Sequence, residues 1–73
     1  DFSGAGMLES DLSEGDFEKS NFEETDLRRC ILKNANFDQS DFRNSNIAMA
    51  DFTGSSLVDV NFDNSNQYQT VFD

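Results

Sequence analysis

The chain has 73 residues, one cysteine and no histidine. It is therefore limited to one small domain, and both an intramolecular disulfide and the usual zinc ligand sets are excluded. Its formal net charge of -10 argues against direct binding to nucleic acid or anionic lipid, because both need basic patches. No apolar run approaches the roughly 18 residues of a membrane-spanning helix.

A five-residue period runs through the whole chain. Fourteen of the fifteen residues at every fifth position from Phe2 onward are large and apolar, and all eight Phe residues fall among them. We call these residues the centres. The small position, two residues earlier, holds a small side chain in every unit except at Val60, and the Asx position, directly before the centre, holds Asp or Asn in eleven of fifteen units.

This period fits neither an α-helix nor a flat strand, whose side chains repeat at 3.6 and 2.0 residues. A chain that turns a corner every five residues satisfies it, and four sides of five residues bring the chain back above itself. Centres and small positions then point inward, where a narrow interior cannot hold two large side chains on each side. Asp and Asn are predicted at the corners, because they bond nearby backbone and tolerate turn dihedrals.

The units "SNFEE", "ANFDQ", "SDFRN" and "ADFTG" resemble the pentapeptide-repeat family, whose consensus is roughly A(D/N)LXX. The resemblance covers residues 1–73. It implies an all-β fold, a right-handed quadrilateral parallel β-helix with about 3.6 coils of twenty residues, stacked ~4.8 Å apart.

Taken in chain order, the coils are residues 1–20, 21–40, 41–60 and 61–73, and residues twenty apart are expected to stack in columns. The predicted core columns are Phe2, Phe22, Phe42 and Phe62; Leu12, Leu32, Phe52 and Phe72; and Phe17, Phe37 and Leu57. The fourth column, Met7, Leu27, Ile47 and Gln67, ends on a polar residue, which predicts a frayed or capped last coil.

The domain organisation expected is a single solenoid over residues 1–73. A stacked repeat exposes a sheet edge at each end and normally needs caps, yet the sequence offers no polar cap or terminal amphipathic helix. We therefore expect the 73 residues to be a segment of a longer chain, or to be capped by a partner or by end-to-end association.

Few residues could carry chemistry. Without histidine, acid–base work would fall to carboxylates and nucleophilic work to Ser, Thr or Cys30. Cys30 stands at a small position and is predicted to be a buried, inert thiol, whereas a redox thiol would need exposure and a nearby base. The Asp residues lack the spacing of a calcium loop and are interpreted as structural. The sequence predicts no catalytic, cofactor or metal site.

One predicted outer wall differs from the others, because apolar and Arg side chains line it. Its residues are Leu8 and Glu9, Arg28 and Arg29, Ala48 and Met49, and Tyr68 and Gln69. Such a line is typical of an interface, although scattered exposed apolar residues are also normal. The candidate partner-binding residues are Leu8, Arg28, Arg29, Ala48, Met49 and Tyr68. Ile31 and Val71, which replace Asp or Asn beside Asp51, either extend this surface or are tolerated corners.

The function expected is a non-catalytic structural or protein–protein interaction module that docks a protein partner. Because members of the family are frequent in cyanobacteria and in the thylakoid lumen, the resemblance implies an accessory subunit of a photosynthetic assembly, soluble in the thylakoid lumen or the cytoplasm. The alternative is an acidic DNA mimic that inhibits a type II topoisomerase, DNA gyrase, as quinolone-resistance members do. A mimic needs phosphate-like rows of carboxylate, whereas one outward column mixes Ser3, Glu23, Arg43 and Asp63.

Overall fold

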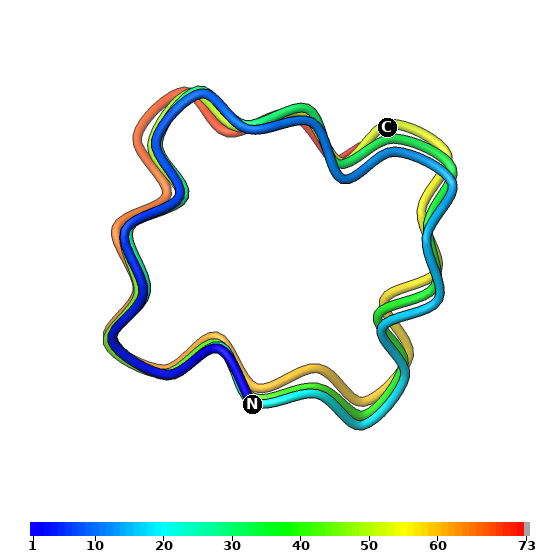
Figure 1. The fold of residues 1–73 in the computed structure, drawn as a ribbon, viewed down its shortest axis with the longest axis horizontal. Helices are drawn as coiled ribbons and strands as arrows, with labels where there is room; N and C mark the ends of the chain where they lie inside the picture. The colour runs from blue at the N-terminus through cyan, green and yellow to red at the C-terminus, as the bar shows by residue number, and fades with distance from the viewer. Residues whose placement is uncertain (73) are drawn as a thin grey trace.

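The computed structural model describes residues 1–72. Over these residues the chain contains no helix and no extended strand, and it is built from turns and isolated parallel β-bridges between residues twenty apart. The bridges run from Gly6 with Asp26 to Asp51 with Val71. Figure 1 shows the result, a chain that follows a four-sided outline and passes repeatedly over its own path. The predicted all-β class and the twenty-residue pairing agree with this arrangement.

Backbone hydrogen bonds join each twenty-residue coil to the next. The N–H of each centre from Phe2 to Phe52 donates to the Asx-position carbonyl of the following coil, as in Phe22 to Asp41 at 2.7 Å. The second residue after the centre donates in the same direction, as in Glu24 to Arg43 at 3.0 Å. These bonds recur along the chain, so each side of one coil is bound to the same side of the next coil by main-chain hydrogen bonds. Such bonds do not depend on side-chain identity.

Each corner is a turn that spans the two residues after the centre, which we call the first and second outer positions. The N–H of the next small position closes it by donating to the carbonyl of the centre, as in Ser45 to Phe42 at 3.2 Å. The second outer residue has a positive φ in all fourteen units from Gly4 to Gln69, between 54° and 76°. The prediction that Asp and Asn take the turn dihedrals is therefore wrong, because the left-handed residue lies three positions further on.

The other half of that prediction, that Asp and Asn bond nearby backbone, is confirmed. In all eleven units with Asp or Asn at the Asx position, the side-chain Oδ1 accepts the N–H of the first outer residue at 2.8–3.2 Å. This short bond fixes the approach to the turn, while the residue that carries it stays in a β-bridge.

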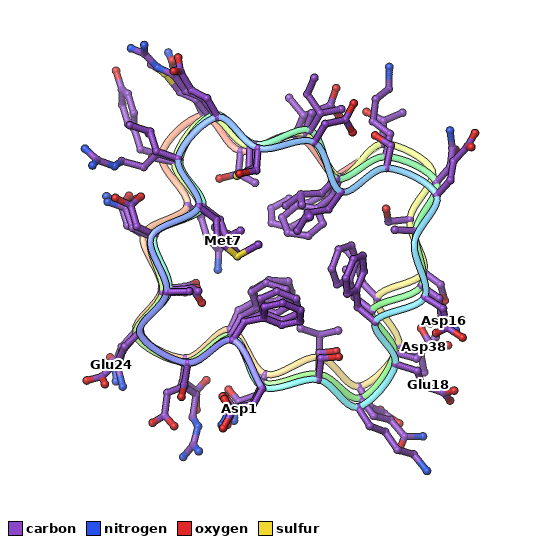
Figure 2. All side chains as sticks on the ribbon, viewed as in Figure 1. Asp1, Met7, Asp16, Glu18, Glu24 and Asp38 are labelled. Atoms are coloured by element: carbon purple, nitrogen blue, oxygen red, sulfur yellow. The ribbon has the colours of Figure 1, made fainter. Side chains whose placement is uncertain are left out.

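The core lies along the axis of the coils, and Figure 2 shows centres inside the outline and charged residues such as Glu18 and Glu24 outside it. Seven consecutive centres are 0 % exposed. They are Phe22, Leu27, Leu32, Phe37, Phe42, Ile47 and Phe52. Centres nearer the ends, such as Phe2 and Phe62, are partly buried and pack against this core. Phe72, predicted to be a core residue, stacks on Phe52 at 5.5 Å but is 38 % exposed, since only one neighbouring coil covers it.

Aromatic rings stack within three of the four predicted columns. Ring centroids in the first column are 4.9 Å apart between Phe2 and Phe22, 4.7 Å between Phe22 and Phe42, and 5.4 Å between Phe42 and Phe62. Phe37 meets Phe42 edge-on at 5.6 Å. Offset-stacked and edge-to-face pairs are both favourable arrangements of aromatic rings, so the all-Phe column stabilises the coils along and across the axis.

The small positions fill the rest of the interior and satisfy buried carbonyls. Ser40 Oγ donates to the carbonyl of Phe17 at 2.8 Å, and Ser45 Oγ donates to that of Phe42 at 2.7 Å. Among residues 1–72, every buried side-chain nitrogen or oxygen has a hydrogen-bond partner. A hydroxyl is therefore accommodated in this apolar core without an unpaired polar atom, which is otherwise costly to bury.

The last coil does not fray at Gln67. Bridges continue on both sides of it, between Asn46 and Asn66 and between Asp51 and Val71. The Gln67 side chain is exposed and its Nε2 donates to Ser65 Oγ at 2.8 Å. The polar side chain at this centre stays outside the core, but the main-chain hydrogen bonds that join the coils are unaffected.

Candidate functional site

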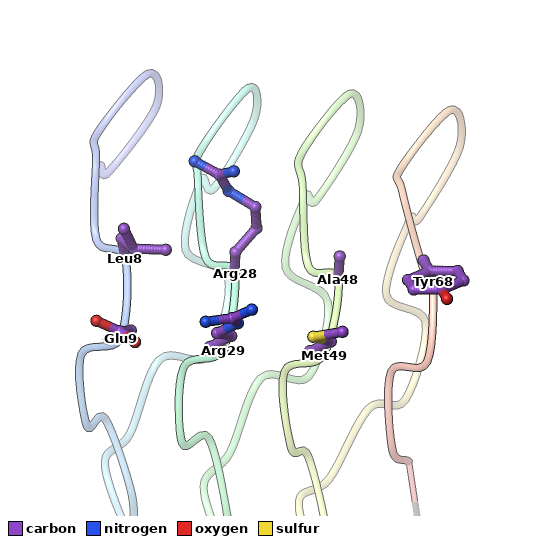
Figure 3. A pocket seen from close by; sticks show the side chains of 7 residues that line it. All are labelled: Leu8, Glu9, Arg28, Arg29, Ala48, Met49 and Tyr68. Carbon is purple, nitrogen blue, oxygen red and sulfur yellow. The ribbon is translucent and has the colours of Figure 1, made fainter.

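The outer wall singled out from the sequence surrounds an open hollow of about 380 Å³. We call it the Leu8–Tyr68 wall. The residues that line the hollow are Leu8, Glu9, Arg28, Arg29, Ala48, Met49 and Tyr68. They occupy the first and second outer positions of four successive coils, so all six candidate residues stand in two parallel columns (Figure 3).

The apolar side chains of this wall are held in water. Tyr68 is 62 % exposed, Leu8 52 % and Met49 41 %. Their backbones are fixed by coil-to-coil bonds such as Met49 to Tyr68 at 2.8 Å, so the side chains cannot turn inward, where the centres already fill the core. Grouped apolar side chains on a rigid surface are a feature of interaction sites.

The two arginines of the wall have different surroundings. Arg28 binds Asp26 through two contacts, Nε to Oδ1 at 2.9 Å and Nη2 to Oδ2 at 2.8 Å. This hydrogen bonding lowers the pKa of Asp26 below its usual range. Figure 3 shows the Arg28 guanidinium directed away from the row of Arg29. Within residues 1–72 the Arg29 guanidinium makes no ion pair, so it is the cation that the hollow offers to a ligand.

The formal charges on and beside the wall sum to zero, although the molecule as a whole is acidic. Arg28 and Arg29 balance Glu9 on the wall and Asp26 at its edge, so the whole formal net charge of -10 belongs to the other residues. An acidic partner that approaches this wall therefore meets less electrostatic repulsion than it would elsewhere on the surface, and a basic partner meets less attraction.

Ile31 and Val71 border the wall along one edge. They lie two residues after Arg29 and Gln69, they bridge to Asp51 on either side, and they are 43 % and 47 % exposed. At Asp51 the carboxylate accepts the Thr53 N–H at 2.9 Å. Ile31 has no side-chain acceptor for this bond, so it gives up a turn contact and exposes an apolar side chain in its place, and Val71 likewise exposes an apolar side chain.

Cys30 is a core residue, as predicted. It is 1 % exposed and its Sγ donates to the carbonyl of Met7 at 2.8 Å. Desolvation by burial raises the pKa of the thiol, which keeps it protonated and unreactive at neutral pH.

The acidic columns are partly neutralised from within. Arg43 binds Asp41 at 2.7 Å and lies 3.9 Å from Glu23, so a cation stands between Glu23 and Asp63 in their outward column. In the part of the chain that the structure describes, no three carboxylate or Cys side chains gather closely enough to hold a metal ion.

Asp38 has a role that sequence reasoning missed. Ser56 stands at an Asx position, and Asp38 of the preceding coil takes over the missing contact: its Oδ1 accepts the Val58 N–H at 3.0 Å and the Ser56 hydroxyl. The only signal in the sequence was an acid at the first outer position eighteen residues before the exception. One coil therefore supplies a turn acceptor to the next.

Comparison with known proteins bears on the repeat. The family model described as pentapeptide repeats matches residues 20–58 with eight copies, whereas no curated protein matches the chain. Among residues 1–72 there is no helix that is long and apolar enough to cross a membrane. Members of the matched family are generally structural or interaction modules. With more than half of the sequence matched, the chain belongs to the pentapeptide-repeat family.

Proposed function

We propose that this chain is a non-catalytic interaction module that docks a protein partner on the Leu8–Tyr68 wall. In this proposal the chain is a section of right-handed quadrilateral β-helix with about 3.6 coils, which holds the wall rigid. The observation that carries it is the gathering of exposed Leu8, Met49 and Tyr68 around one hollow on a neutral wall. Arg29, which makes no ion pair within residues 1–72, lines the same hollow.

The size of the apolar contribution supports a partner that also contacts the rim. Fully burying one large apolar side chain contributes about 1.5–3 kcal/mol. Leu8, Met49 and Tyr68 are roughly half exposed, so covering them contributes about half of that each. Micromolar affinity requires about 8 kcal/mol in total, and the partner therefore needs Arg29 and neighbours such as Ile31 as well.

Rigidity supports the proposal too. The main chain under the wall is hydrogen-bonded from coil to coil, as in Arg29 to Ala48 at 3.0 Å. A surface that does not have to be ordered on binding keeps more of its contact energy as affinity. One version of the proposal, which depends on family resemblance alone, is an accessory subunit of a photosynthetic assembly in the thylakoid lumen or the cytoplasm.

The second candidate is a DNA mimic that inhibits DNA gyrase, for which the net charge of -10 is the favourable observation. Against it, Asp1, Asp16 and the other Asx-position carboxylates are used in turn bonds, and Arg43 interrupts the column of Glu23. Salt dependence separates the candidates, because a carboxylate-led mimic loses its partner steeply as salt rises and an apolar patch with one cation loses it less.

The test is affinity capture with three forms of the chain. The natural chain is compared with a Met49→Glu, Tyr68→Glu variant and with a Gln39→Glu, Val58→Glu variant, which adds the same charge at exposed positions of another wall. A partner kept by the natural chain and the control but lost by the wall variant supports the proposal. A partner retained equally by all three forms contradicts it, and a retained topoisomerase favours the mimic.

A further inference from the structure

Six of the seven residues that line the hollow already use their main-chain N–H group within the chain. Along its second outer column, the N–H groups of Glu9, Arg29 and Met49 donate to Arg28, Ala48 and Tyr68 at 3.0, 3.0 and 2.8 Å. Strand addition depends on free main-chain donors and acceptors at a sheet edge. Because few N–H donors are free on this wall, we expect a partner to recognise it mainly through side chains.

The spacing of the columns fits a helix better than an extended segment. Rings stacked in the all-Phe column are 4.7–5.4 Å apart, in line with a coil spacing of about 4.8 Å. A helix that runs along the columns advances about 5.4 Å per turn and matches one turn to one coil. An extended segment repeats about every 6.6 Å on one face and loses register by nearly 2 Å at each coil.

The dimensions of the wall give the length and width of such a helix. Three coil spacings separate Leu8 from Tyr68, about 14 Å, which roughly ten helical residues cover. A helix with its side chains is about 10–12 Å wide. That width covers both outer columns and extends toward the rim at Ile31 and Val71, whose apolar side chains are exposed.

The side chains of the wall indicate which residues a bound helix presents to it. We expect apolar side chains of the partner opposite Leu8, Met49 and Tyr68, which stand in the first, third and fourth coils. Arg29, in the second coil, lacks an ion pair within residues 1–72. We propose that the wall binds an amphipathic α-helix of the partner, which lies along the columns and presents an apolar stripe interrupted by one carboxylate opposite Arg29. This inference rests on the proposed function of the wall.

The experiment uses two displayed libraries selected against the natural chain. One presents randomised residues on the exposed face of a stable helical scaffold, and the other presents them in an extended strand. The Met49→Glu, Tyr68→Glu variant serves as counter-selection. We expect helical binders with an apolar stripe and one Asp or Glu, and we expect Arg29→Glu to weaken them at least about tenfold, as for an interfacial charge pair. Replacing the binder's carboxylate by Lys should restore binding to Arg29→Glu.

Several outcomes would overturn the inference. Enrichment of extended binders alone, or of helical binders insensitive to Arg29→Glu, leaves the wall as a docking surface but removes the helix. Sedimentation that reveals a dimer of the natural chain, lost in the Met49→Glu, Tyr68→Glu variant, assigns the wall to a second copy instead. Failure to obtain any binder that distinguishes the natural chain from that variant contradicts both the helix and the proposed function. Thermal melts of each variant confirm that the fold is retained.

Discussion

At the scale of single residues, the second outer position has the most restrictive backbone of the repeat. Its φ is positive in every described unit, yet only Gly4 and Gly54 are glycines. An L-residue in the left-handed region is disfavoured by about 1–2 kcal/mol. The coils are therefore stable in spite of twelve unfavourable backbone conformations, which the main-chain bonds and the core impose on Glu, Lys, Arg, Asn, Gln, Met and Asp alike.

Replacing one of these residues by glycine should stabilise the fold. Gln39 has a φ of 61° and an exposed side chain, so Gln39→Gly should raise the free energy of unfolding by about 0.5–1 kcal/mol, after the greater freedom of glycine in the unfolded chain is subtracted. Gln39→Ala removes the same side chain without the conformational gain and is the control. Equal stability of the two variants in urea titrations would contradict the argument.

Truncation of a stacked ring should be costly. Phe42 is 0 % exposed and lies between Phe22 and Phe62, so Phe42→Ala should lower the free energy of unfolding by about 3–5 kcal/mol. Phe72→Ala, at a 38 % exposed ring, is the matched control and should lower it less. A loss below about 1 kcal/mol for Phe42→Ala would mean that the column does not carry the core.

The period identified the inward residues correctly but not the turn residue. Asp and Asn are favoured in turns for two reasons, tolerance of left-handed φ and side-chain bonding to backbone. Their presence in eleven of fifteen units could not distinguish these reasons. At the second outer position the sequence varies from Gly54 to Arg29 and Met49, so composition gave no sign that its φ is uniform.

At the scale of the repeat unit, contacts between coils can replace contacts within one. In most units the acceptor for the first outer N–H comes from the Asx position of the same unit, whereas for Val58 it comes from Asp38. The two arrangements place an oxygen at the same donor, so a pentapeptide can depart from the Asp/Asn pattern and keep its turn.

A double-mutant cycle tests this substitution of one acceptor for another. Asp38→Ala should lower the free energy of unfolding by about 0.5–1.5 kcal/mol, because the Val58 N–H loses its side-chain partner. Ser56→Asn supplies the acceptor found at five other Asx positions, such as Asn36. In that background Asp38→Ala should have little effect. Equal losses in both backgrounds, measured by chemical denaturation, would count against the shared role.

Membership of the Leu8–Tyr68 wall could be predicted because residues twenty apart had to stack once the period was known. The difference between Arg28 and Arg29 could not, since adjacent arginines look equivalent in a sequence. It arises because Arg28 stands two residues after Asp26 on the same side and binds it bidentately. The hollow could not be predicted from the sequence either, because it depends on the sizes of side chains from four coils.

At the scale of the whole molecule, acidity and stability are linked through the Asx positions. Hydrogen bonds lower the pKa of four carboxyl groups: the Ser13 backbone N–H acts on Asp11, Arg28 on Asp26, Arg43 on Asp41 and the Thr53 hydroxyl on Asp51. A folded-state pKa below the unfolded value of 3.8 stabilises the protein while the carboxyl is ionised. The effect is lost as pH falls through the lowered folded-state values.

Stability should accordingly decline on acidification. The contribution of these four groups is fully present above about pH 5 and decreases below it. A variant with Asp11, Asp26, Asp41 and Asp51 all replaced by Asn keeps the Oδ1 acceptors but cannot titrate at these positions. Its melting temperature should fall less between pH 5 and pH 3 than that of the natural chain. Parallel curves for the two proteins would show that other carboxylates determine the acid response.

The pairing of residues twenty apart also governs which changes in length preserve the surface. Removing one pentapeptide leaves every local turn intact but shifts all later units to the next side of the outline, so that residues such as Tyr68 would leave the column of Leu8, Arg28 and Ala48. Removing twenty residues keeps every side in register. Recombination that inserts or deletes repeats therefore preserves this wall only when the number of repeats is a multiple of four. The core alone would accept any whole number of repeats.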